Sequence, residues 1–171
     1  RSALHLADWA VTEAGFGCDL GAEKFFDIKC RTAGFDPAAV VLVATVRALK
    51  MHGGRAKEDL TKPDPAAVAA GLENLEKHVE NVELFGYKPV IALNRFPSDA
   101  PEEIALVRAF AEERGLPFAP GEVYAQGGEG GLELAERVLE ALDLPHAYRP
   151  LYPLEASLEA QVEAIATRVY G

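Results

Sequence analysis

The order of elements along the chain predicts an α/β fold in which a parallel sheet is covered by helices. Four short segments rich in Val, Ile and Ala have strand character, and helical segments lie between them. The second segment is apolar on both faces, as expected for a strand buried inside a parallel sheet. Strands that alternate with helices favour parallel pairing through right-handed crossovers. The expected strands are residues 9–13 (WAVTE), 39–46 (AVVLVATV), 89–93 (PVIAL) and 123–125 (VYA).

The expected helices are recognised by the residues that start and stop them. Gly34 can adopt the left-handed conformation that closes the first helix. Asp64, followed by Pro65, supplies an N-cap and a first-turn proline for the second. Acidic residues in the opening turn of the third helix complement its dipole, and Gly115 ends it. The helices are expected at residues 20–33, 65 to about 86, 98–114, 132–142 and 154–169.

Composition narrows the class of protein. With 171 residues, 49% of them hydrophobic, the chain can bury one substantial core. A net charge of -10 argues against a nucleic-acid partner, because phosphate binding needs clustered Lys and Arg. Cys18 and Cys30 lack metal-ligand spacing, so no metal site is expected and a reducing compartment is indicated. Since no apolar run approaches the roughly 20 residues of a membrane span, we expect a cytoplasmic protein without a membrane partner.

The beginning of the chain is unusual. It opens with Arg1, and residues 1–7 (RSALHLA) have the pattern of the last turns of a helix whose start is absent. A domain normally begins in a polar, exposed segment. This feature suggests a truncated or cleaved chain, although ordinary processing near a natural start explains it equally well.

Four loops with unusual sequences follow the expected strands. In an open parallel sheet, ligands bind at the carboxyl ends of the strands, where loops and helix N-termini converge. We therefore expect one rim to carry the site. The loops are residues 13–20 (EAGFGCDL), 45–54 (TVRALKMHGG), 94–99 (NRFPSD) and 126–131 (QGGEGG).

Two of these loops offer apolar surfaces for a flat ligand. Phe16 stands between two glycines and could project as a stacking platform, although burial in the core is as good an explanation. Phe96 and Pro97 form a similar apolar wall beside the polar pair Asn94 and Arg95, and burial competes here as well.

The other two loops offer an aromatic ring and cations. Tyr124 leads into Gly127 and Gly128, and glycines ahead of a helix let the backbone approach an anion or a ring closely. Arg47 and Lys50 lie at or beyond the end of a buried strand, where cations could bind phosphate or carboxylate or form ordinary surface ion pairs. No residue is assigned a catalytic role.

Taken with these loops, several stretches closely resemble sequences of the formate–tetrahydrofolate ligase family. The resemblance runs through nearly the whole chain, in the family's order. It implies ATP-dependent synthesis of 10-formyltetrahydrofolate from formate and tetrahydrofolate through formyl phosphate, with Mg by implication. It also implies a three-layer, P-loop-NTPase-like fold, incomplete here, and a tetramer. The stretches are residues 43–54 (VATVRALKMHGG), 11–30 (VTEAGFGCDLGAEKFFDIKC), 93–99 (LNRFPSD) and 127–135 (GGEGGLELA).

The resemblance assigns roles to some of these residues. Phe96 and Tyr124 would be the aromatic pair that stacks on a ligand ring, with Phe16 and Pro97 completing the wall. The family usually carries Trp where this chain has Tyr124, and Lys where it has Gln126. Tyr offers a smaller face, and Gln removes a cation that could contact an anion.

The resemblance also indicates what the chain lacks. The sequence has no Gly-x-x-x-x-Gly-Lys-Ser/Thr loop to hold a triphosphate. Residues 1–171 would therefore be a single α/β segment of a larger ligase, without the N-terminal phosphate-loop region and the C-terminal portion. We expect the isolated chain to be inactive and to associate with itself or with the remainder of the ligase.

Three other functions stay open at this point. The chain could be a binding module for folate or nucleotide that performs no chemistry. It could be a fragment of a P-loop GTPase, because Asn94, Arg95 and Asp99 loosely resemble the base-reading Asn-Lys-x-Asp loop of those proteins. It could also be a structural subunit that completes the sheet of another chain.

Overall fold

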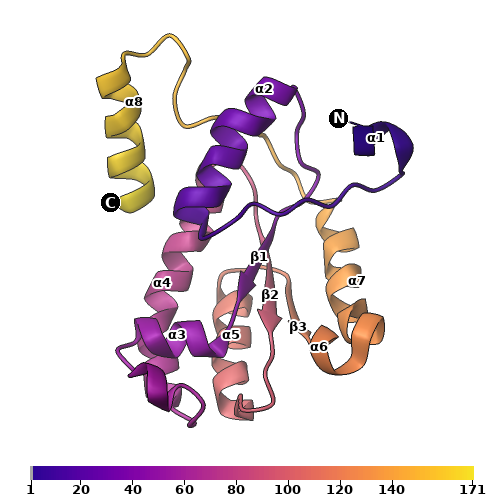
Figure 1. Cartoon of the computed structure of the whole chain (residues 1–171), viewed down its shortest axis with the longest axis vertical. Helices are drawn as coiled ribbons and strands as arrows, with labels where there is room; N and C mark the ends of the chain where they lie inside the picture. Colours follow the sequence, from indigo (N-terminus) through magenta and orange to yellow (C-terminus); the bar gives the residue numbers. More distant parts are fainter. Residues whose placement is uncertain (1) are drawn as a thin grey trace.

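The computed structural model describes residues 2–171, which form a parallel sheet between layers of helices (Figure 1). The described strands are β1 (Val41–Ala44), β2 (Val90–Asn94) and β3 (Phe118–Gly121), in that order across the sheet. Both pairs are parallel, with Val41 opposite Val90 and Ile91 opposite Phe118. The predicted fold class is confirmed, and the arrangement is consistent with an incomplete P-loop-NTPase-like fold.

Two of the four expected strands are wrong. Residues 9–13 pair with no strand among the described residues and belong to the segment that follows α1 (Ser2–Leu6); Arg1 lies outside the described residues. Residues 123–125 belong to α6 (Val123–Gln126), and the third strand comes just before them. The sequence analysis missed this strand because Pro120 lies within it, and proline is uncommon in strands. Because β3 lies at an edge, the missing N–H of Pro120 costs it no essential ladder bond.

The helix signals of the sequence were more dependable. The first expected helix consists of π-helical turns (Cys18–Ala22 and Phe25–Cys30) and α2 (Arg31–Ala33), and it ends at Gly34 with φ 67°. The Asp64 side chain accepts a bond from the Ala67 amide at the start of α4. The remaining expected helices appear as α4 (Pro65–Leu84), α5 (Pro101–Glu113), α7 (Leu132–Ala141) and α8 (Leu158–Ile165), which continues as a π-helical turn (Ala166–Tyr170).

Like α6, the helix α3 (Val46–His52) was not expected. The apolar run in the sequence continues past the end of β1, so strand and helix could not be separated by hydrophobicity. The boundary is set by Thr45, whose hydroxyl accepts a bond from the Ala48 amide at 3.0 Å.

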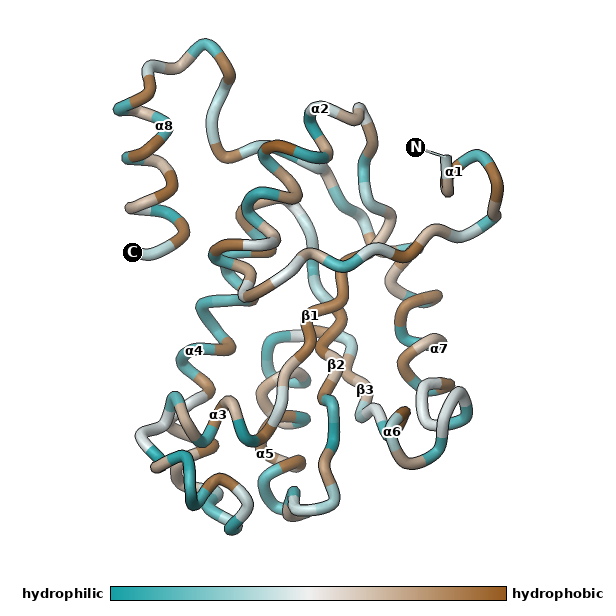
Figure 2. The backbone as a smooth tube through the Cα atoms, in the orientation of Figure 1, coloured by the Kyte–Doolittle hydropathy of each residue, from teal (hydrophilic) through white to brown (hydrophobic). Residues whose placement is uncertain are grey.

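Helices cover the two faces of the sheet unequally. In Figure 1, α4 and α5 lie on one side of the strands and α7 lies on the other. Leu42 and Ala44 point into the core with α4, whereas Val41 and Val43 on the opposite face of β1 are 39% and 63% exposed. The tube coloured by hydropathy shows the strands as the most continuous apolar segment (Figure 2). Within residues 2–171, no helix is both long and apolar enough to cross a membrane.

The helices α3 and α4 pack at unusually close range. A Cβ atom at Gly71 would lie 1.9 Å from the Leu49 carbonyl oxygen, and one at Gly53 would lie 1.9 Å from the Ala67 carbonyl oxygen. Only glycine fits at these two positions. The contact fixes α3 on α4 directly below the end of β1.

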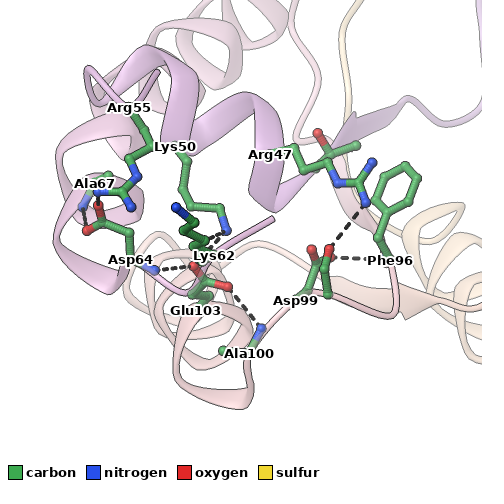
Figure 3. Close-up of polar contacts among 12 residues, drawn as sticks. Arg47, Lys50, Arg55, Lys62, Asp64, Ala67, Phe96, Asp99, Ala100 and Glu103 are labelled. Atoms are coloured by element: carbon green, nitrogen blue, oxygen red, sulfur yellow. Dashed lines mark hydrogen bonds and ion pairs between the residues drawn. The ribbon is translucent and has the colours of Figure 1, made fainter. Parts of the chain in front are cut away.

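A buried ion pair between Lys50 and Glu103 links α3 to the start of α5 (Figure 3). Lys50 Nζ lies 2.9 Å from Glu103 Oε1, and both side chains are fully buried. The same carboxylate accepts bonds from the amides of Asp64 and Ala100, while the ammonium donates to the Lys62 carbonyl. One pair thus joins α3, the loop before α4 and the first turn of α5.

The ionised form of Glu103 is stabilised by these partners. Burial raises the pKa of Glu103, but the amides of Asp64 and Ala100 and the Lys50 ammonium together lower it below its ordinary value. Because the folded-state pKa is lowered, ionised Glu103 stabilises the folded state fully at pH values above its unfolded-state pKa. It is lost as the pH falls through the folded-state pKa.

Replacing Lys50 by Met should destabilise the fold by about 3–5 kcal/mol at neutral pH, because Glu103 would stay buried without its cation. Urea unfolding followed by circular dichroism measures this change. The matched control is Lys62→Met, which removes an exposed ammonium paired with Asp59 and keeps the Lys62 carbonyl. Equal effects of the two substitutions would contradict the role of the buried pair.

Candidate functional site

Three of the four unusual loops lie at the carboxyl edge of the sheet. They follow β1, β2 and β3, as expected. The fourth, residues 13–20, does not, because residues 2–12 contain no strand. Its Gly17 instead lies against the His78 ring of α4. The expectation that all four loops share one rim is therefore wrong for the first of them.

A small pocket opens between the loops after β2 and β3. Its volume is about 230 Å³. The backbone amide of Arg95 donates to the Gly121 carbonyl at 3.0 Å, which holds the two loops side by side beyond the last paired strand residues. The lining of the pocket is mostly apolar and comprises Arg95, Phe96, Pro97, Glu122, Tyr124 and Ala125.

The structure brings together only part of the predicted aromatic set. Phe96, Pro97 and Tyr124 line the same pocket, and the Tyr124 side chain is 94% exposed. Phe16 is 92% exposed, with φ 63°, and it is not among the residues that line this pocket. The expectation that Phe16 completes the apolar wall is not met in this arrangement.

The loop after β2 is held by its own turn. Asp99 Oδ2 accepts a bond from the Phe96 amide at 2.9 Å, and the Asp99 amide donates to the Phe96 carbonyl at 3.0 Å. The Arg47 guanidinium lies 4.1 Å from the centre of the Phe96 ring and donates to Ser98 Oγ (Figure 3). Asp99 is only 8% exposed and does not line the pocket, so the structure gives no support to the base-reading role of a GTPase loop.

A polar edge borders the pocket beside the rings. Arg95 Nη1 donates to Glu122 Oε1, and Gln126 Nε2 donates to Glu122 Oε2. Asn94, the last residue of β2, is exposed and lies opposite Gly121 in the sheet. Glu122 was not predicted as a site residue. Its place directly before Tyr124 was a signal that the sequence offered.

The predicted glycines shape the turn and do not line the pocket. Gly127 has φ 60° and ψ -141°, a conformation open essentially to glycine alone. Gly128 follows it in the 3₁₀ turn (Gly127–Gly131) that leads into α7. Any contact of these backbones with a ligand stays a prediction.

The two candidate cations have different positions. Arg47 lies at the rim against Phe96. Lys50 is fully buried, and its ammonium contacts Glu103 and the Lys62 carbonyl. An anion outside the protein could not reach Lys50 without breaking the buried pair, so the structure does not support Lys50 as an anion-binding residue.

The two cysteines have the properties of structural thiols. Burial raises the pKa of both the Cys18 and the Cys30 thiol to about 11, so both stay protonated and weakly nucleophilic at neutral pH. Across residues 2–171, no group of three or more His, Cys, Asp or Glu side chains is placed to hold a metal ion.

Comparison with known proteins identifies the family. The family model described as formate–tetrahydrofolate ligase matches residues 1–171. The chain belongs to the formate–tetrahydrofolate ligase family. It is 81% identical over 169 residues to the formate–tetrahydrofolate ligase of Thermus thermophilus, and 55% identical over 171 residues to that of Staphylococcus aureus. These matches cover 99% and 100% of this chain, which spans 31% of the length of each of these relatives.

Replacing Asp99 by Ala should loosen the ligase loop that carries Phe96. The substitution removes the acceptor of the Phe96 amide, so that amide should exchange with solvent about fivefold faster, which corresponds to about 1 kcal/mol. Hydrogen exchange followed by NMR measures the rate. Asp99→Asn keeps a side-chain oxygen as acceptor and serves as the control. Unchanged exchange in Asp99→Ala would contradict this role.

Proposed function

We propose that the pocket of Phe96, Pro97 and Tyr124 holds a flat heterocyclic ring of a ligase substrate, either the pterin of tetrahydrofolate or the base of ATP. One observation carries the proposal. Two aromatic side chains and a proline from different loops line one pocket of about 230 Å³. This volume is below the range of sites that enclose a whole drug-sized ligand, so it suits a ring system with its tail outside.

Membership of the family supports a proposal for the chemistry. In the proposed reaction, ATP phosphorylates formate to formyl phosphate with release of ADP, and tetrahydrofolate takes the formyl group to give 10-formyltetrahydrofolate and phosphate, with Mg present. The chain's own residues would bind and orient the ring from both sides. Arg47, whose guanidinium lies 4.1 Å from the centre of the Phe96 ring, would contact an anionic part of the ligand.

In this proposal, phosphoryl chemistry belongs to parts of the ligase that this sequence does not contain. Residues 1–171 would act as one α/β segment, and the remainder of the ligase or further copies of it would be its partners. The exposed Val41 and Val43 give such a partner an apolar face on β1. The second candidate function is a folate- or nucleotide-binding segment that takes part in no reaction. It rests on the same pocket and differs from the first only in that no catalysis by a larger ligase follows binding.

Ring binding should depend on the two aromatic residues. Phe96→Ala should weaken binding of tetrahydrofolate, or of ADP, by roughly tenfold, because one stacking face is lost. Tyr124→Trp should strengthen binding severalfold, because Trp offers a larger face. Titration followed by protein fluorescence reports both changes. Tyr170→Ala removes an exposed aromatic residue outside the pocket and should leave affinity unchanged. Binding that is indifferent to Phe96→Ala would rule out this pocket.

The isolated chain should not catalyse the ligase reaction. We expect formate-dependent ADP formation, measured with tetrahydrofolate present, to stay at background, because the sequence has no phosphate-holding loop. Turnover clearly above background would show that these residues suffice for the reaction and would refute this part of the proposal.

A further inference from the structure

Two buried carboxyl groups lie one turn apart in the first helical segment, residues 18–33, away from the pocket. Glu23 and Asp27 are 4% and 3% exposed. Their spacing of four residues places them on the same face of the helix, and their side chains are within hydrogen-bonding reach of each other. Two ionised carboxylates in this position would repel each other, and burial removes the solvent that would screen them.

Asp27 attaches a distant part of the chain to this helix. Its Oδ1 accepts a bond from the Leu151 amide at 2.9 Å and one from Arg31 at 3.1 Å. The same arginine donates to the Tyr152 carbonyl at 2.6 Å. Leu151 and Tyr152 belong to the connector, residues 145–153, which leads to α8. The ionised form of Asp27 therefore holds the connector on the helix.

The second carboxylate oxygen of Asp27 lacks a comparable donor. No N–H or hydroxyl group of residues 2–171 donates to Oδ2, although this atom is buried. A buried acceptor without a donor costs free energy. The neighbouring Glu23 carboxyl can supply a donor only while it carries a proton, because an ionised carboxylate is an acceptor alone.

We propose that Glu23 and Asp27 share one proton and form a pH-dependent clasp that holds the connector on the first helical segment. The proton lies on Glu23, which donates it to Asp27 Oδ2. Asp27 keeps its charge because Leu151 and Arg31 donate to it, whereas the ion pair of Glu23 is a long one, 3.7 Å to the exposed Lys24. When Glu23 loses the proton, two carboxylates face each other and the bond to Leu151 weakens. This inference does not depend on ring binding.

The surroundings of the clasp favour a retained proton. Burial raises the pKa of Glu23, and the Asp27 charge raises it further; burial also raises the pKa of Asp27, against the Leu151 amide and Arg31. Burial raises the pKa of the neighbouring tyrosines too, so they stay neutral near neutral pH. Besides Arg31, the charged and titratable groups around the pair are Asp19, Lys24, Tyr148, Tyr152, Arg168 and Tyr170.

The direction of the pH dependence follows from the raised pKa of Glu23. The clasp stabilises the folded state fully at pH values below the unfolded-state pKa of Glu23, and this contribution is lost as the pH rises through the folded-state pKa. The pKa values of Glu103 and His78 are lowered, so the contributions of these two groups are lost as the pH falls. Global stability therefore mixes opposite effects, and the test needs a readout at the connector itself.

The test follows the Leu151 amide of this chain by hydrogen exchange and NMR. The measured quantity is its protection factor, which is already corrected for the intrinsic pH dependence of exchange. Between about pH 5 and about pH 8 this factor should fall about tenfold, because the bond that Leu151 donates to a charged group is weakened.

Two variants separate the shared proton from a general effect of charge. Glu23→Gln supplies an N–H donor to Asp27 at every pH, so the fall at Leu151 should shrink to within about twofold. Thermal unfolding shows whether this variant keeps the fold. Glu133→Gln removes the same charge from an exposed position on α7 and should keep the full fall.

The outcomes decide the inference. A Leu151 protection factor that stays constant or rises over this pH range in the unchanged chain overturns it. An undiminished fall in folded Glu23→Gln also overturns it, because the proton on Glu23 would then have no part in the effect. The profile of the unchanged chain decides the question even if Glu23→Gln does not fold.

Discussion

The buried pair of Lys50 and Glu103 is the interaction on which the candidate site depends. Two charges that are both removed from water are tolerated because each is paired, and here the partners come from α3, the loop between α3 and α4, and the start of α5. Breaking the pair would leave a charge that no neighbouring water can solvate. The pair therefore fixes the N-terminal turn of α5, and with it the end of the loop that carries Phe96.

The pocket arises from the way two adjacent parallel strands end. The Arg95 amide continues the hydrogen-bond ladder to Gly121, so the chains separate only after this point. One then turns through Asp99 and the other through the helical turn α6, which places Phe96 and Tyr124 on one opening. The pocket is thus a consequence of sheet geometry, in which loops at carboxyl ends converge.

The sequence predicted what is decided locally. The ends at Gly34 and Gly115 and the cap at Asp64 depend on a few neighbouring atoms, and they were correct. The wrong expectations required knowledge of distant neighbours. A run such as residues 9–13 has strand composition but finds no partner strand, whereas Pro120 is tolerated because its strand lies at an edge. The burial of Lys50 could not be foreseen, since Glu103 lies far along the chain.

The same distinction explains how much of the site this chain can specify. Phe96, Tyr124, Arg95 and Glu122 all come from two neighbouring strand ends, so one local part of the fold forms the pocket that this chain shows. The sequence has no Gly-x-x-x-x-Gly-Lys-Ser/Thr loop, the usual cradle of a triphosphate. Under the proposed function, ring selection and catalysis are therefore physically separable. Under that proposal, the strength of the ring contact is set here by the area of the two aromatic faces.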